Sequence, residues 1–176
     1  MIIPSYMSNV ELSIIRLFSQ KSDVELTILQ LSKNLKKSYA FTNKYAHEML
    51  KQDILKKKVV GNAILCSLNK DNEKLLGLLV MNSISRKMQF EHSLKDDSKI
   101  ELSAFLRSID DSKTVFLSGS VVTVISDDKV PVVKKVAGFK VIISSFDSFI
   151  KGKASLELSD VIVLKNHERF WSVIYR

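Results

Sequence analysis

Two segments rich in β-branched and other apolar residues meet at the pair Gly61-Asn62, and no other feature of the sequence limits the fold as strongly. Residues 54–60 precede the pair and residues 63–68 follow it. A Gly-Asn pair between two such segments is typical of a tight turn between antiparallel strands. The sequence therefore predicts a β-hairpin over residues 54–68.

Three helical patterns precede this hairpin. Ser8 and Glu11 have the spacing of a capping box at the start of a helix at about 8–19, and Thr27 and Gln30 repeat it for a short helix at about 27–34. A third helix is expected at about 38–52. The order helix, short helix, helix, hairpin is that of a winged helix-turn-helix. In that fold the third helix enters the major groove of DNA, and the hairpin lies beside the backbone or the minor groove.

Positive charge is concentrated in the same region. The chain of 176 residues has a net charge of +8, and residues 33–58 hold eight lysines against two acidic residues, Glu48 and Asp53, a net charge of +6. Such a stretch favours binding to a polyanion by counterion release. The alternative interpretation is a solvated lysine face that keeps the protein soluble.

The third helix offers groups that can read DNA bases. If Ala46, Met49 and Leu50 face inward, polar side chains share the opposite face. An asparagine there can pair with adenine, and lysines can reach bases or phosphates. The candidate DNA-binding residues lie in the turn before the helix, on the helix and on the first hairpin strand: Lys36, Lys37, Ser38, Tyr39, Asn43, Lys44, His47, Lys51, Lys56, Lys57 and Lys58.

The rest of the chain predicts a second domain, reached through a long helix at 73–92. An i+4 stripe on that helix is widened by four neighbouring apolar residues, and we expect this broad surface to be buried on two sides, as an interdomain spine or a dimer contact. The stripe is Leu76, Val80, Ile84 and Met88, and the residues that widen it are Leu75, Leu78, Leu79 and Met81. Ser98 and Glu101 predict a capped helix at about 98–109. Strands are expected at 114–118, 121–125, 139–143 and 160–164, with helices at about 146–153 and after Asn166.

The predicted class is therefore α+β, with a small C-terminal α/β domain and a short mixed sheet. The expected domains are a winged helix at 1–72, a linking or dimerisation helix at 73–95 and the second domain at 96–176.

The whole chain resembles archaeal-type proteins in which a winged helix-turn-helix precedes a nucleotidyltransferase-like domain. The first half carries the resemblance in residues 26–35 and 49–55. The second half carries it in 115–118 followed by Gly119-Ser120, and in 161–165 and 168–171. The resemblance implies that Gly119 and Ser120 bind nucleotide phosphates; the alternative is a tight turn between strands.

The sequence departs from this family where the metal-binding carboxylates belong. Active members carry an Asp-x-Asp pair on the strand after a short helix, and that pair holds catalytic magnesium. Here the strand at 121–125 follows Ser120 at once and holds no carboxylate, while Asp127 and Asp128 are adjacent at its end. Neighbouring residues on a strand point to opposite faces. We therefore hypothesise a catalytically inactive domain, although an enzyme is not ruled out.

Other chemistry finds little support in the sequence. One cysteine, Cys66, excludes an intrachain disulfide and a cysteine-based zinc site, and the sequence contains no P-loop or dinucleotide-binding motif. We expect no cofactor, no metal site and no catalytic residue. The N-terminus lacks the features of a signal peptide, and the apolar run at 75–81 is too short to cross a bilayer, so a cytoplasmic protein without membrane contact is expected.

Three functions remain open. The leading one is a transcriptional regulator that binds double-stranded DNA and uses its second domain for homodimerisation or sensing. The alternative is an antitoxin-like nucleotidyltransferase whose winged helix binds a substrate or an operator. The third is a winged helix that binds an acidic protein partner.

Overall fold

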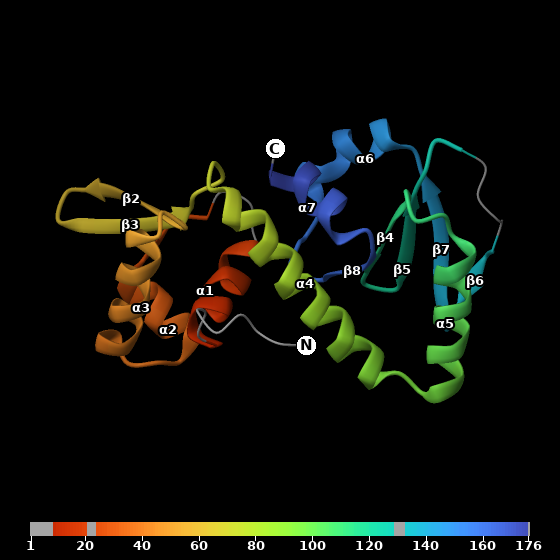
Figure 1. Ribbon diagram of the computed structural model, residues 1–176, viewed down its shortest axis with the longest axis horizontal. Helices are drawn as coiled ribbons and strands as arrows, with labels where there is room; N and C mark the ends of the chain where they lie inside the picture. The colour runs from red at the N-terminus through yellow and green to blue at the C-terminus, as the bar shows by residue number, and fades with distance from the viewer. Residues whose placement is uncertain (1–8, 21–23, 129–132, 176) are drawn as a thin grey trace. The chain divides into compact units, whose positions relative to one another are not determined.

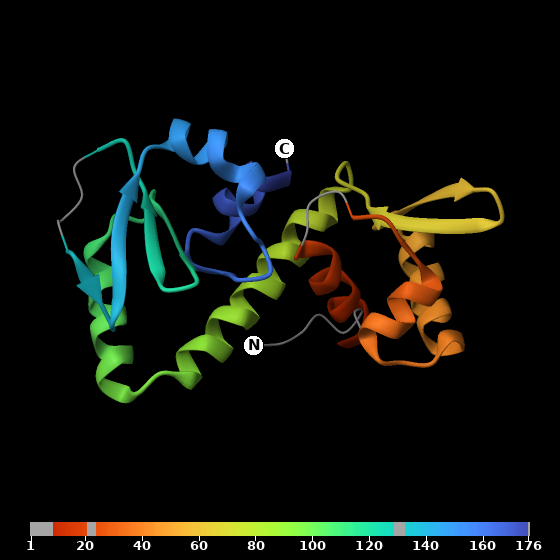
Figure 2. The same cartoon turned by 180° about the vertical axis from the view of Figure 1, so that it is seen from behind.

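The computed structural model describes residues 9–20, 24–128 and 133–175, which divide into two compact units (Figures 1 and 2). The first unit is Met1–Asn82 and the second is Ser83–Arg176. Helix α4 (Glu73–Ser93) contains the boundary and contributes residues to both units.

The N-terminal unit is a winged helix-turn-helix. Its sheet has three antiparallel strands in the order β1-β3-β2, and the hairpin β2–β3 extends past the helices as the wing (Figure 1). The expected hairpin and the order of the three helices are confirmed. In chain order the elements are α1 (Asn9–Ser19), β1 (Leu26–Thr27), α2 (Ile28–Leu35), α3 (Tyr39–Lys51), β2 (Leu55–Val60) and β3 (Ala63–Leu68).

Local signals explain where α2 begins. The Gln30 N–H donates to Thr27 Oγ1 over 3.2 Å, and the Thr27 N–H donates to Gln30 Oε1 over 2.8 Å. This reciprocal pair is the expected capping box, and it satisfies two backbone donors that the helix leaves unpaired. The box expected at Ser8 lies outside the described residues.

Helix α4 buries one part of the broad apolar surface expected for it. The stripe Leu76, Val80 and Ile84 is half-buried and Met88 is 43% exposed, and a dimer contact through this stripe stays a prediction. An α-helix advances 3.6 residues per turn, so an i+4 series drifts around its surface by about 40° at each step. The buried positions follow i, i+3, i+4, i+7 and i+8 spacing: Leu75, Leu78, Leu79, Asn82 and Ser83.

The C-terminal unit is built around a five-stranded mixed sheet in the order β6-β7-β5-β4-β8. Strands β5 and β7 run parallel, and the other neighbouring strands run antiparallel. The mixed sheet and the α+β class are confirmed. Its remaining elements are α5 (Asp96–Ser108), β4 (Thr114–Ser118), β5 (Val121–Ile125), β6 (Lys135–Val136), β7 (Phe139–Ser144), α6 (Phe146–Gly152), a 3₁₀ turn (Lys153–Ser155), β8 (Val161–Lys165) and α7 (His167–Tyr175).

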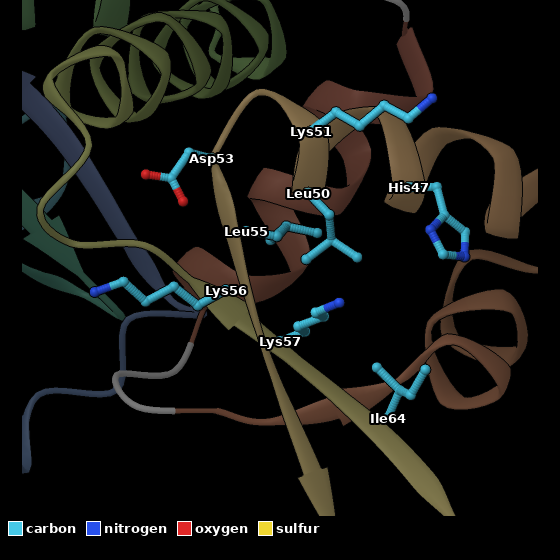
Figure 3. Close-up of a pocket in the computed structure, with 8 residues that line it drawn as sticks. All are labelled: His47, Leu50, Lys51, Asp53, Leu55, Lys56, Lys57 and Ile64. Carbon is cyan, nitrogen blue, oxygen red and sulfur yellow. The ribbon is translucent and has the colours of Figure 1, made fainter.

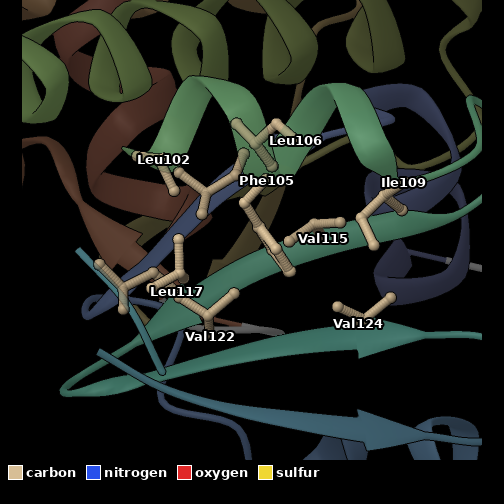
Figure 4. Close-up of a cluster of buried hydrophobic side chains, with 10 residues drawn as sticks. Leu102, Phe105, Leu106, Ile109, Val115, Leu117, Val122 and Val124 are labelled. Carbon is tan, nitrogen blue, oxygen red and sulfur yellow. The ribbon is translucent and has the colours of Figure 1, made fainter. Parts of the chain in front are cut away.

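Side chains from both faces of this sheet are buried. Helix α5 packs Leu102, Phe105 and Leu106 on one face, against Val115 and Val124 (Figure 4). On the other face, the Phe116 ring lies 5.7 Å from that of Phe149 and 5.4 Å from that of Phe170, which belong to α6 and α7. The sheet is therefore the middle layer of three.

One expected helix start differs from the one observed. Helix α5 begins at Asp96, and its N-cap Lys95 makes no side-chain cap, so the capping box expected at Ser98 was wrong. Asp96 and Asp97 instead occupy the first turn, where carboxylates favour the positive end of the helix dipole. Helix α7 begins directly after Asn166, as expected; Asn166 itself has a left-handed φ of 57°, and its side-chain amide donates to the Ser112 carbonyl.

Candidate nucleic-acid interface

The turn between α2 and α3 presents two lysines. The Lys37 N–H donates to the Ser32 carbonyl over 3.0 Å, and the Lys36 N–H donates to the Lys33 carbonyl over 3.2 Å. This pair of bonds is a Schellman motif, whose left-handed position glycine usually fills. Lys36 fills it here with φ 53°. Lys36 and Lys37 are both exposed directly before α3.

Ser38 is the N-cap of α3. Its hydroxyl oxygen accepts a hydrogen bond from the Phe41 N–H over 3.3 Å, which fixes the start of the helix. The hydroxyl proton of Ser38 is still free to point elsewhere, so this candidate residue can donate to a phosphate while it caps the helix.

Helix α3 has a buried and an exposed face. Thr42, Ala46 and Met49 are buried, which confirms the inward direction expected for the last two. Leu50 is only half-buried. Four of the candidate residues on the helix are exposed: Tyr39, Lys44, His47 and Lys51. The fifth, Asn43, is half-buried.

Aromatic side chains support the start of this face. The rings of Phe41 and Tyr45 meet edge to face at 5.0 Å, and Lys44 Nζ lies 5.8 Å from the centre of the Tyr45 ring. Tyr39 and Phe41 remain 53% and 41% exposed. The first turns of α3 therefore carry aromatic surface beside a cation.

The three lysines of the wing do not share one face. Strand alternation puts Lys57 on the same face of the hairpin as Leu55, whereas Lys56 and Lys58 lie on the other face. Leu55 is buried, and so is Cys66, the residue directly opposite Lys57. The face that carries Lys57 is therefore the face that packs on the helices.

Lys56 and Lys58 each have an acidic partner. Lys56 Nζ lies 2.5 Å from Asp71 Oδ2, and Lys58 Nζ lies 3.3 Å from Glu25 Oε1. The hydrogen bond from Lys56, and then its charge, lower the pKa of the Asp71 carboxyl below its ordinary value. Two of the three wing lysines thus already have a counter-charge.

A groove of about 470 Å³ lies between α3 and the wing (Figure 3). Leu50, Leu55 and Ile64 form its apolar lining. Lys57 reaches from β2 into this space toward the side of His47, whereas Lys56 points the opposite way (Figure 3). The groove therefore combines an apolar floor with the side chains of Lys51 and Lys57, which can bind an anion, and the carboxylate of Asp53 also lines it.

Two asparagines hold the wing against α3; the sequence predicts Asn72 as the cap of the helix at 73–92 and gives no role to Asn69. Asn69, 2% exposed, donates from Nδ2 to the Asp53 carbonyl over 2.8 Å. Asn72 Nδ2 donates to the Gln52 carbonyl over 3.1 Å. Both bonds join the residues after β3 to the turn that ends α3. For Asn69, its position directly after a strand was the only signal in the sequence.

The lysines around α3 lack the acidic partners that Lys56 and Lys58 have. Within the described parts of the chain, no ion pair involves Lys36, Lys37, Lys44, Lys51 or Lys57. A phosphodiester would therefore meet these ammonium groups without displacing a carboxylate.

Gly119 and Ser120 form a tight turn. Ser118 and Val121 pair with each other at the end of the β4–β5 hairpin, and Gly119 has a left-handed φ of 56°. No helix separates the two strands. The carboxylate of Asp127 accepts from the Phe146 N–H over 3.0 Å, and Asp128 forms an ion pair with Lys113. The two aspartates therefore engage different partners.

Two kinds of site are not found in the described residues. Residues 9–20, 24–128 and 133–175 contain no group of three or more histidine, cysteine, aspartate or glutamate side chains placed to hold a metal ion. No helix among the described elements has the length and apolar character needed to cross a membrane.

No family model and no curated protein matches the sequence. Solved structures of ZitR from Lactococcus lactis, a zinc-responsive MarR family member, are similar to parts of the chain. The crystal structure of this zinc-responsive ZitR is 18% identical to the chain with a TM-score of 0.38, and the match covers 60% of this chain and 75% of that chain. Wild-type ZitR in complex with DNA has 18% identity, a TM-score of 0.39 and coverages of 60% and 74%. Likenesses of this size carry no functional argument, and the assignment of a winged helix follows from the order and pairing of the chain's own elements.

Proposed function

We propose that the chain is a transcriptional regulator whose N-terminal unit binds double-stranded DNA. The observation that carries this proposal is a set of exposed lysines on the α2–α3 turn, on α3 and on the inner face of the wing, none of which forms an ion pair with a described residue. In a winged helix these elements are the ones that meet the duplex.

Each group has a distinct role in the proposal. Lys36, Lys37 and Lys57 bind phosphates, and Ser38 adds a hydroxyl donor at the start of α3. Lys44, His47 and Lys51 face the major groove or its edges, with Asn43 and Tyr39 beside them. Lys56 and Lys58 contribute less, because each is already paired with a carboxylate.

Salt dependence tests the proposal. Fluorescence anisotropy with a labelled duplex should show an affinity that falls by orders of magnitude between low and moderate salt, since several phosphate contacts release counterions. The triple variant Lys36→Glu, Lys37→Glu, Lys57→Glu should lose binding while its circular dichroism spectrum stays unchanged.

A matched control separates local from total charge. Lys95→Glu, Lys134→Glu, Lys140→Glu makes the same change in net charge on exposed residues of the C-terminal unit and should bind duplex nearly as well as the wild type. If the first triple variant keeps its affinity, or if both variants lose it equally, the assigned face is wrong. An acidic protein partner would then be the better explanation of the lysines.

We further propose that the C-terminal unit does not transfer nucleotides and serves in dimerisation or sensing. The turn at Gly119-Ser120 and the separate partners of Asp127 and Asp128 support this reading. The nucleotidyltransferase-like relationship itself rests on the short sequence matches alone. Labelled nucleoside triphosphates with magnesium should give no transfer to nucleic acid or protein; transfer that disappears in Asp127→Ala or Asp128→Ala would overturn the proposal.

Homodimerisation is proposed through the outer stripe of α4. Leu76, Val80 and Ile84 are half-buried and Met88 is 43% exposed, so the stripe is apolar surface that a second copy could cover. Sedimentation equilibrium should give a dimer for the wild type and a monomer for Met88→Glu. A monomeric wild type at micromolar concentration would contradict it.

A further inference from the structure

The tip of the wing is apolar and exposed. Val59 is 66% exposed, Val60 51% and Ile64 41%, and Val59 lies directly opposite Ile64 in the hairpin. Residues 59–65 contain no charged side chain, although three lysines precede them at 56–58. Apolar side chains at the end of a projecting hairpin are a liability in water and favour unwanted association. The tip of the wing is therefore a candidate contact surface.

We propose that Val59 and Ile64, with Val60 on the opposite face of the hairpin tip, form an apolar wedge that enters the minor groove of bound DNA and bends the duplex. This inference rests on the DNA binding proposed above. It adds a way of recognising sequence that the lysines do not supply, because it selects duplexes that deform easily.

The position of the wedge relative to the cations favours DNA as its partner. Val59 and Ile64 lie on the same face of the hairpin as Lys57, the face that turns toward the groove beside α3. A strand rises about 3.3 Å per residue, so Val59 lies about 7 Å beyond Lys57 along β2. The minor groove is about 7.5 Å deep. A phosphate held by Lys57 would thus leave the tip within reach of the groove floor.

The chemistry of these side chains limits how they can act. Valine and isoleucine have no donor or acceptor, so they cannot read base edges through hydrogen bonds. Apolar residues in the minor groove instead push between base steps, partly unstack them and kink the duplex. β-branched side chains have few rotamers, so little conformational freedom is lost on insertion.

The wedge predicts a preference in the DNA. Pyrimidine–purine steps such as TA unstack at low cost, whereas A-tracts are stiff. The chain should therefore bind a duplex with central TA steps more tightly than a duplex of equal length and composition with a central A-tract, and it should bend the first.

Resonance energy transfer across a duplex of about 30 base pairs, labelled at both ends, measures this bend directly. The full chain is compared with Val59→Ala, Val60→Ala, which removes exposed methyl groups and is expected to fold. The double variant should bend the TA duplex less, bind it about tenfold more weakly and keep the wild-type slope of affinity against salt. A second double variant, Val59→Thr, Val60→Thr, keeps the β-branched shape and the strand propensity. A loss of bending in this variant therefore cannot come from a poorly formed hairpin.

Two matched variants isolate the wedge. Ile100→Ala removes an equally exposed apolar side chain, 69% exposed on α5, and should change neither bend nor affinity. Lys57→Gln should lower the salt slope by about one and leave the preference for TA steps in place.

The outcomes distinguish the wedge from DNA binding itself. A wild type with no salt-dependent affinity for any duplex overturns both the proposed function and the wedge. A wild type that binds duplex, with a Val59→Ala, Val60→Ala variant that keeps the same bend and the same affinity, overturns the wedge alone. If the variant instead loses self-association while bending DNA normally, the tip is a contact between copies of this chain and the wedge is equally overturned.

Discussion

Lys57 and Lys58 are adjacent on β2 and lie on opposite faces of the wing. Lys57 lines the groove beside α3, whereas Lys58 Nζ lies 3.3 Å from Glu25 Oε1 on the other face. Two identical side chains one residue apart therefore have different electrostatic surroundings. The same substitution at Lys57 or at Lys58 changes the composition and the net charge equally, so any difference between the two variants comes from the face of the wing.

The first prediction uses this pair. Lys57→Gln should weaken duplex binding and lower the slope of log affinity against log salt by about one, because one phosphate contact is lost. Lys58→Gln removes the same charge and should leave the slope unchanged. Anisotropy titrations over a series of salt concentrations measure both variants. Equal effects of the two substitutions would mean that the wing binds DNA through total charge and not through its inner face.

The second prediction concerns Lys36, a non-glycine residue in left-handed backbone at the end of α2. Glycine adopts this conformation without the steric cost of a Cβ, which is about 1 kcal/mol for other residues. Lys36→Gly should therefore keep or raise the free energy of unfolding while it weakens duplex binding. Urea denaturation and anisotropy give the two quantities. Lys33→Gly, inside the same helix, is the control and should lose stability. If Lys36→Gly keeps full affinity, Lys36 is not a phosphate contact.

Much of the winged helix could be predicted from the sequence because its signals are local. The Thr27–Gln30 capping box and the Gly61-Asn62 turn involve residues a few positions apart, and both formed as expected. Asn69 could not be identified in this way, because its bond to the Asp53 carbonyl spans 16 positions and depends on how β3 ends beside α3.

The wing lysines show where a local signal was present and was not used. A period of two along β2 already separates Lys57 from Lys56 and Lys58, but a block of three like charges was treated as one surface. The acidic partners Glu25 and Asp71 lie 33 and 15 positions away from their lysines and need the tertiary structure. On α4, hydropathy marked the leucines but gave no sign that polar Asn82 and Ser83 would be buried.

The third prediction concerns pH and the C-terminal unit. Burial, and then the charge of Lys87, lower the pKa of His167 from its ordinary value of 6.5 to about 4, and His167 Nδ1 lies 2.8 Å from Ser83 Oγ. Between these two values the unfolded chain binds the proton more strongly than the folded chain. Stability from neutral His167 is therefore present above pH 6.5 and is lost as the pH falls toward 4.

His167→Gln tests this linkage, since glutamine stays neutral and can still bond to Ser83. Urea midpoints measured at pH 7.5, 5.5 and 4.5 should fall more steeply for the wild type than for the variant. Carboxylates contribute equally to both proteins, so the difference between the two curves isolates the histidine. Parallel curves would mean that His167 accepts its proton without cost in the folded state.

The last prediction decides between a turn and a phosphate site at Gly119. Gly119 has φ +56°, and a Cβ built there meets no atom within 4 Å, so the cost of a side chain is conformational and not steric crowding. Gly119→Ala should destabilise the chain by about 1 kcal/mol through left-handed backbone alone. Gly152→Ala, at a glycine with φ −86° and equal space, is the control and should not destabilise. Thermal denaturation with and without magnesium and a nucleoside triphosphate completes the test. The nucleotide should not raise the melting temperature of the wild type or of either variant. A rise in the wild type that Gly119→Ala abolishes would assign a phosphate to this turn.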